Sequence, residues 1–190
     1  MLSIIIASVF LPFLPLLPIH ILIQNLLNDF AQIGMPFDDV DDEYIEKPKA
    51  WDTNGIKRFM FKFGLISTVL DILCFGVLWF IMKFNTADKE ALFQTGWFAF
   101  GIISQTWIIH MIRTHKIPFV QSKSSKQLLI STFAIMLLTM IITFTHLATG
   151  FDLYKLPYSY LIWIIVLLCI YTFFIQIYKK IHLRNNNEWL

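Results

Sequence analysis

The sequence predicts an all-α protein, a polytopic bundle of transmembrane helices. The chain of 190 residues is 57% hydrophobic and 15% charged, with a mean hydropathy of +0.65. Soluble domains are about 45–50% apolar and about 25% charged. The apolar residues gather in runs, several of which reach the roughly 20 residues that cross a bilayer as a helix. These runs do not alternate between apolar and polar residues, as the strands of a membrane β-barrel do.

Six apolar runs mark the predicted helices. Backbone groups in lipid must satisfy their own hydrogen bonds, so a spanning run forms a helix. The first run is too short for a complete span, whereas the others come close to the required length or exceed it. In order, the runs cover residues 2–14, 16–35, 59–84, 95–112, 127–147 and 157–178. Residues 1–184 therefore form one membrane domain, and residues 185–190 form a tail that we expect to be frayed.

The basic residues predict which ends of the helices face the cytoplasm. If the loops 36–57 and 113–126 lie on the same side as the C-terminus, that side collects most of the lysines and arginines. The residues on this side are Lys47, Lys49, Lys57, Arg58, Lys62, Arg113, Lys116, Lys123, Lys126, Lys179, Lys180 and Arg184, and those on the other side are Lys83, Lys89 and Lys155. We therefore expect these loops and the C-terminus to be cytoplasmic, and the short loops near 85–94 and 148–156 to face outward.

The loop 36–57 is strongly acidic. Its carboxylates belong to Asp38, Asp39, Asp41, Asp42, Glu43 and Glu46. The spacing lacks the central glycine and the terminal glutamate of an EF-hand calcium loop. A dense acidic cluster of this kind is more often a solvated surface than a ligand site, and we interpret it in that way.

Polar side chains at membrane depth are costly and therefore mark candidate functional sites. The strongest cluster in this chain comprises Gln24, Asn25, Asn28, Asp29 and Gln32. Asn25, Asn28 and Asp29 have i+3 and i+4 spacing, which places them on one side of a helix. Amide and carboxylate oxygens are hard ligands that suit Mg²⁺ or Ca²⁺. The alternative is that these amides form interhelical hydrogen bonds, which hold packed membrane helices together.

Three prolines precede this polar helix. Pro12, Pro15 and Pro18 remove backbone donors and interrupt regular helix. Discontinuous helices near the midplane recur in transporters, because the freed carbonyl groups can coordinate cations. The alternative is that the prolines form a hairpin turn at the membrane surface.

Two isolated polar residues are candidates for an ion pathway. Asp71 lies midway along the run 59–84, and Gln105 lies in the run 95–112. A carboxylate at this depth is expected to face the interior of the bundle. The Ser and Thr side chains of residues 131–145 are instead expected to bond to carbonyl groups of their own helix.

The segment 11–48 reads LPFLPLLPIHILIQNLLNDFAQIGMPFDDVDDEYIEKP. It resembles the junction between the fifth and sixth transmembrane helices of P-type ATPases, in particular the bacterial magnesium-transporting subgroup. The step Asn25-x-x-Asn28-Asp29 is similar to the family's Asn-x-x-(Thr or Asn)-Asp cation-binding motif. The stretches FGLISTVLDILCF, TGWFAFGIISQTWIIHMIRT and IPFVQS resemble the seventh and eighth helices and the loop beyond them. The resemblance covers essentially the whole chain.

This resemblance implies part of the fifth helix through the tenth helix of a ten-helix transport domain. It implies that Asn25, Asn28 and Asp29 help to bind Mg²⁺, the transported ion, and that the loop 36–57 docks against the phosphorylation domain. It also implies a location in the bacterial inner membrane with a cytoplasmic C-terminus.

The family's catalytic motifs are absent from this sequence. It contains no Asp-Lys-Thr-Gly-Thr, no Thr-Gly-Glu-Ser and no Gly-Asp-Gly-x-Asn-Asp. We therefore expect a fragment that cannot hydrolyse ATP alone and that works with the first helices and the actuator, phosphorylation and nucleotide domains of a pump. The alternative is an autonomous membrane scaffold or accessory subunit without transport activity. A net charge of only +2 argues against a nucleic-acid partner.

Overall fold

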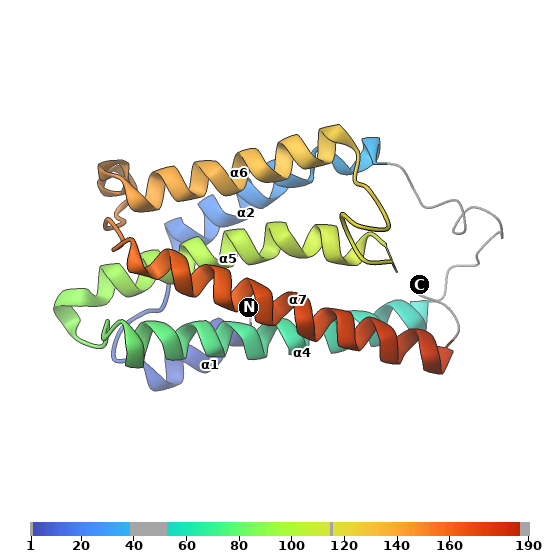
Figure 1. The fold of residues 1–190 in the computed structure, drawn as a ribbon. Coiled ribbons are helices and arrows are strands. Elements are labelled where there is room, and N and C mark those ends of the chain that lie inside the picture. The colour runs from blue at the N-terminus through green and yellow to red at the C-terminus, as the bar shows by residue number, and fades with distance from the viewer. Residues whose placement is uncertain (1, 39–52, 115, 187–190) are drawn as a thin grey trace.

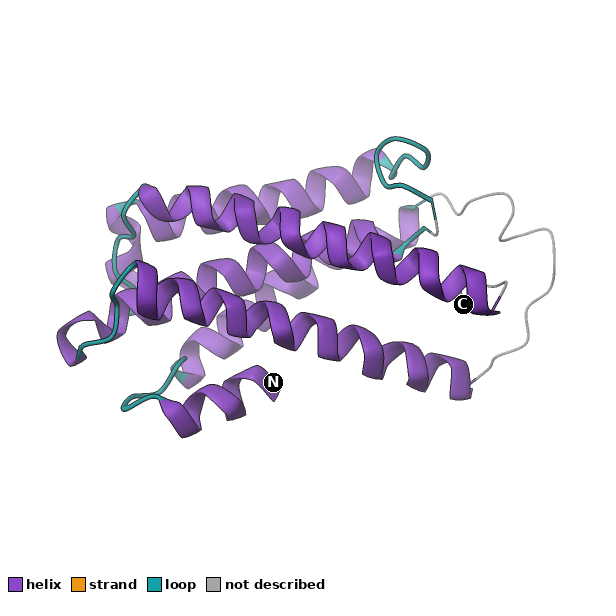
Figure 2. Cartoon of the chain, turned by 60° about the horizontal axis from the view of Figure 1, so that its bottom comes forward, coloured by secondary structure: helices purple, strands orange, loops and turns teal. Residues whose placement is uncertain are grey.

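The computed structural model describes residues 2–38, 53–114 and 116–186, so most of the acidic loop 36–57 and the end of the tail 185–190 lie outside the described residues. The described residues are helical, without a strand (Figure 2). The helices are α1 (Leu2–Phe10), α2 (Pro18–Gln32), η1 (Met35–Phe37), α4 (Thr53–Gly76), the π-helical η2 (Val77–Ile81), η3 (Ala87–Lys89), α5 (Glu90–Ile112), α6 (Lys126–Phe144), η4 (His146–Phe151) and α7 (Ser159–Asn186). This composition agrees with the predicted all-α class.

The long helices lie side by side along one axis (Figure 1). One end of the bundle carries the connections 11–17, 82–89 and 145–158. The other end carries the C-terminal end of α2, the start of α4, the segment 113–125 and the C-terminal end of α7. The described parts of the segments that the basic residues assign to the cytoplasmic side therefore lie at the same end of the bundle.

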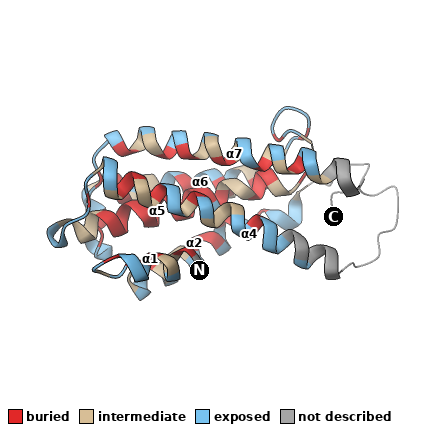
Figure 3. Ribbon diagram, turned by 90° about the horizontal axis from the view of Figure 1, so that it is seen from below, coloured by how far each residue is buried: buried red, intermediate tan, exposed pale blue. Residues whose placement is uncertain are grey.

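Helix α5 is the centre of the bundle. It packs against α2, α4, α6 and α7, while α1 packs on α4. Every residue from Phe93 to Ile103 is buried, and Figure 3 shows α5 as largely buried. Two groups of buried apolar side chains meet on this helix: one joins it to α1, α4 and α7, and the other joins it to α2 and α6.

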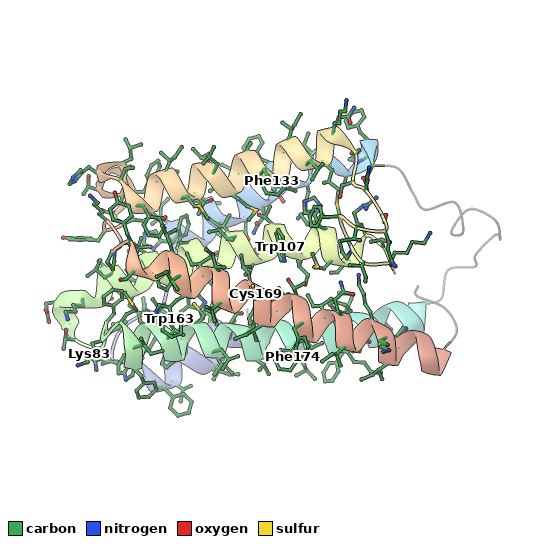
Figure 4. All side chains as sticks on the ribbon, in the orientation of Figure 1. Lys83, Trp107, Phe133, Trp163, Cys169 and Phe174 are labelled. Atoms are coloured by element: carbon green, nitrogen blue, oxygen red, sulfur yellow. The ribbon has the colours of Figure 1, made fainter. Side chains whose placement is uncertain are left out.

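Three helices within the described residues are long and apolar enough to cross a membrane: Met60–Ile81, Lys126–Phe144 and Ser159–His182. Their outer faces carry large apolar side chains, including Phe133 and Phe174 (Figure 4). Helices α1 and α2 have 9 and 15 residues and fall below the required length. Helix α5 has 23 residues but contains several polar ones, most of which are buried by the surrounding helices.

The observed helix bounds differ from the predicted runs where polar residues or prolines intervene. Helix α5 begins at Glu90 rather than at residue 95, because its first turn is polar and hydropathy alone does not include it. Helix α2 begins at Pro18 rather than at residue 16, since proline fits the first turn, where its missing N–H has no helical partner. Helix α1 ends at Phe10, ahead of Pro12.

The hydroxyl groups of α6 bond to carbonyl groups of their own helix, as the sequence predicts, although Ser131 also donates to the carbonyl oxygen of Ala31 on α2 at 2.9 Å. Thr132 donates to the carbonyl oxygen of Leu128 at 2.7 Å, and Thr139 donates to that of Ile135 at 2.8 Å. Thr143 donates to the carbonyl oxygen of Thr139 at 2.8 Å. Thr132 Oγ1 also lies 2.9 Å from Nε2 of His110 on α5, so it links the two helices as well.

We expect Gly34→Ala to destabilise the junction of α2 and α6. A Cβ atom at Gly34 would lie 2.6 Å from the backbone Cα of Leu128, which cannot move without separating the helices. Overpacking of this kind costs about 1–3 kcal/mol. The expected result is a lower thermal unfolding temperature of the purified chain in detergent. Gly64→Ala is the matched control, because nothing lies within 4 Å of its new methyl group, and an equal effect of both variants would contradict the prediction.

Candidate functional site

Asn28 is the buried member of the polar cluster on α2. Its Nδ2 donates to Oε1 of Gln105 on α5. Its Oδ1 is buried and has no hydrogen-bond partner within the described residues. A buried carbonyl oxygen without a partner costs about 1–3 kcal/mol, and such an oxygen is a ready ligand for a cation. The structure thus places the predicted ligand Asn28 in hydrogen-bond contact with Gln105, a predicted pathway residue.

A cavity of about 60 Å³ lies beside this pair, between α1, α2, α4 and α5. Its polar lining comes from Ser3, Gln24, Asn25, Asp71 and Gln105. All five side chains carry oxygen atoms, and one is a carboxylate. The fold therefore brings Asn25, Asp71 and Gln105, which are far apart in the sequence, to the wall of one cavity.

Asp71 lies on the boundary between two cavities. Its Oδ2 accepts a hydrogen bond from Ser3 Oγ at 2.6 Å. A second cavity of about 110 Å³ shares Ser3 and Asp71 but is otherwise lined by apolar side chains such as Phe10 and Phe75. The carboxylate therefore has a polar cavity on one side and an apolar cavity on the other.

Asp29 does not line the cavity. It is exposed, whereas Asn28 beside it is buried against α5. Asn25 is also exposed and opens onto the cavity. The three predicted ligands are thus close together in the sequence of α2 but face three different environments.

Gly101 allows α2 to approach α5 at the cavity. A Cβ atom at this position would lie 2.8 Å from Gln24 Nε2. At the far end of α2, His20 is fully buried, and its Nε2 lies 3.1 Å from the carbonyl oxygen of Phe151. These contacts fix the rotation and position of the helix that carries the candidate ligands.

An ion pair fixes the segment that follows α2, at Asp38 directly after η1. Arg113 Nε donates to Asp38 Oδ2 at 2.5 Å, and the two side chains are only 7% and 14% exposed. Asp38 Oδ1 accepts from the backbone N–H of Ser125 at 2.7 Å. Arg113 also donates to Ser122 Oγ at 3.1 Å and to the carbonyl oxygen of Lys123 at 3.1 Å. The end of η1 is thereby tied to the segment between α5 and α6.

Two of these roles, those of Ser3 and of the pair Arg113 and Asp38, have no local signal in the sequence. Ser3 is a single small polar residue in an apolar run, and no local pattern connects it with Asp71. Arg113 contributed to the charge bias, and Asp38 belonged to an acidic cluster that we interpreted as solvated. For Asp38 that interpretation was wrong, because its side chain is mostly buried and paired.

Comparison with known proteins matches residues 13–181 to the family model described as "Cation transporting ATPase, C-terminus". The chain is 46% identical over 182 residues to "Magnesium-transporting ATPase, P-type 1" of Escherichia coli, an alignment that covers 96% of the chain and 20% of that protein. Two proteins of Salmonella typhimurium with the same description are 45% and 41% identical. The chain spans about a fifth of the length of these relatives. Together these matches show that the chain belongs to the family of cation-transporting P-type ATPases and corresponds to their C-terminal membrane region.

Proposed function

We propose that this chain is the membrane part of an ATP-driven Mg²⁺ transporter and forms part of its cation site and pathway. The observation that carries the proposal is the unpartnered, buried Oδ1 of Asn28 beside an oxygen-lined cavity. The identity to magnesium-transporting relatives supports Mg²⁺ as the transported ion. The ligand chemistry by itself is compatible with other small divalent cations.

Asn25 and Asn28 supply neutral oxygens to the ion, and Asp29 supplies charge. One carboxylate with a few amide oxygens suits Mg²⁺, which dehydrates reluctantly and keeps several waters when it binds. Asp29 lies on an exposed part of α2, where other helices of the pump would complete its surroundings. Gln105 accepts a hydrogen bond from Asn28 and so orients its side chain. Asp71 lies further along the ion pathway.

ATP hydrolysis belongs to domains outside this chain. The partners are the first helices of the pump and its actuator, phosphorylation and nucleotide domains. Movements of those parts expose the cation site alternately to each side of the membrane. The bundle lies in the bacterial inner membrane with its C-terminus in the cytoplasm. This orientation is supported by the gathering of the basic segments at one end of the bundle (Figure 1).

A chimaeric pump tests the proposal. The 182 matching residues of the Escherichia coli relative are replaced by this chain, and the chimaera is expressed in a strain that lacks Mg²⁺ uptake. We expect growth at limiting Mg²⁺ and Mg²⁺-stimulated ATPase activity in purified membranes. A chimaera that inserts, folds and forms a phosphoenzyme but neither transports nor responds to Mg²⁺ would contradict the proposal and favour a scaffold role.

A further inference from the structure

We propose that the apolar cavity between α1, α4 and α5 binds a lipophilic amine, with Asp71 as the partner of its ammonium group. The cavity has a volume of about 110 Å³. Side chains of α1 and α4 form most of its lining, and Trp97 adds a wall from α5. The proposal is independent of the transport function argued above, because it concerns a ligand that binds to this chain alone.

The walls of this cavity suit the apolar body of such a ligand. Ile6 and Ala7 line it from α1, Ile72 and Phe75 line it from α4, and Trp97 lines it from α5. A cavity of about 150 Å³ lined by Leu, Ile and Phe side chains stays dry and binds benzene. A cavity of about 110 Å³ with one open side therefore accommodates a single ring or a short alkyl chain.

The cavity has a buried wall and an exposed rim. Ala7 and Trp97 are only 5% and 4% exposed, whereas Phe10 is 75% and Ile72 is 45% exposed. Phe10 belongs to α1 and Ile72 to α4, so the opening lies between these two helices at the surface of the described bundle. A molecule dissolved in the bilayer can therefore enter the cavity without crossing the polar parts of the protein.

Asp71 supplies the charged group of the cavity lining. Its Oδ2 accepts a hydrogen bond from Ser3 Oγ at 2.6 Å. Within the described residues, no donor bonds to Oδ1 and no basic side chain forms an ion pair with this carboxylate. Small-molecule sites combine an apolar lining with a few polar groups that fix the orientation of the ligand. An ammonium group at Oδ1 would place the apolar body of an amine against the aromatic walls.

The lining favours an organic cation over a metal ion. Among the described residues that line the cavity, Ser3 and Asp71 are the ones with side-chain oxygens, and Mg²⁺ requires a nearly octahedral set of oxygen ligands. Phe75 and Trp97 instead present two aromatic rings, whose centroids are 6.4 Å apart in an edge-to-face arrangement. Aromatic faces attract an ammonium group, so the rings add to the attraction of the carboxylate.

The test measures binding to the purified chain in an uncharged detergent. The probes are para-fluorobenzylamine, which is protonated at neutral pH, and para-fluorobenzyl alcohol, a neutral molecule of nearly the same shape, and fluorine NMR follows each of them. We expect the amine to bind saturably. We expect the dissociation constant of the alcohol to be about tenfold higher or more, because hydrogen bonds to charged groups are stronger than those between neutral groups.

Two variants identify the site. Asp71→Asn keeps the size of the side chain and removes its charge, and we expect it to bind both probes with equal affinity. Asp88→Asn, at an exposed position, is the matched control and is expected to keep the preference for the amine. Ala7→Leu fills the cavity from its buried wall, and we expect it to lose saturable binding of both probes. Circular dichroism and thermal unfolding show whether each variant is folded.

The amine site is refuted if the parent chain binds the amine no more tightly than the alcohol, or if folded Ala7→Leu protein binds the amine as the parent does. A folded Asp71→Asn variant that still prefers the amine would also refute it. If Asp71→Asn does not fold, the comparison of the two probes on the parent chain and on Ala7→Leu decides. The measurement requires neither ATP nor Mg²⁺, so its failure and the failure of the transport function are separate results.

Discussion

Asp29→Asn is expected to abolish Mg²⁺-stimulated ATP hydrolysis in the full-length pump that contains this segment. The substitution removes the charge that the proposed α2 site offers to the ion and keeps the size of the side chain. Mutation of groups that only support a metal ligand already costs 10–100-fold in affinity or activity, so the loss of a charged ligand is expected to cost roughly a hundredfold or more. Growth at limiting Mg²⁺ is expected to disappear with the ATPase activity.

Because of the position of Asp29, this substitution tests ion binding without a change in the stability of the fold. Asp29 is exposed, and no hydrogen bond or ion pair within the described residues holds it. Its substitution is therefore expected to leave the thermal stability of the bundle unchanged, and Asp88→Asn provides a control for charge removal at an exposed site. Normal transport by Asp29→Asn would show that the polar residues of α2 serve helix packing.

Arg113→Ala is expected to produce the largest loss of stability. Arg113 and Asp38 are both mostly buried, and their charges meet at 2.5 Å. Removing one member of a buried ion pair costs about 3–5 kcal/mol, because the remaining charge is left without a partner. The substitution also removes the donors to Ser122 Oγ and to the carbonyl oxygen of Lys123, which loosens the segment between α5 and α6.

Thermal unfolding in detergent and the amount of protein in membranes measure this effect. The double variant Asp38→Ala with Arg113→Ala is expected to be less destabilised than the sum of the single variants, because it leaves no unpaired charge. Asp38→Asn is expected to be milder than Asp38→Ala, since an amide oxygen can still accept from the N–H of Ser125. Strict additivity, or an unchanged unfolding temperature for Arg113→Ala, would show that the ion pair contributes little.

The family and the all-α class were accessible from the sequence because they depend on local properties. A run of apolar residues in lipid must be helical, and the step from Asn25 to Asp29 defines one side of a helix wherever that helix packs. The Thr side chains of α6 also bond within their own helix. None of these features requires knowledge of a neighbouring helix.

The sequence by itself therefore determined which segments form helices, which polar residues occur within the apolar runs and which family the chain resembles. Only the tertiary structure decided that Asn28 meets Gln105 across 77 residues, that Ser3 meets Asp71 across 68 and that Arg113 meets Asp38 across 75. Such pairs depend on how each helix is rotated and how closely it packs, as at Gly34 and Gly101. Helix rotation and packing distance are set by many side chains acting together, so hydropathy and local spacing do not encode them.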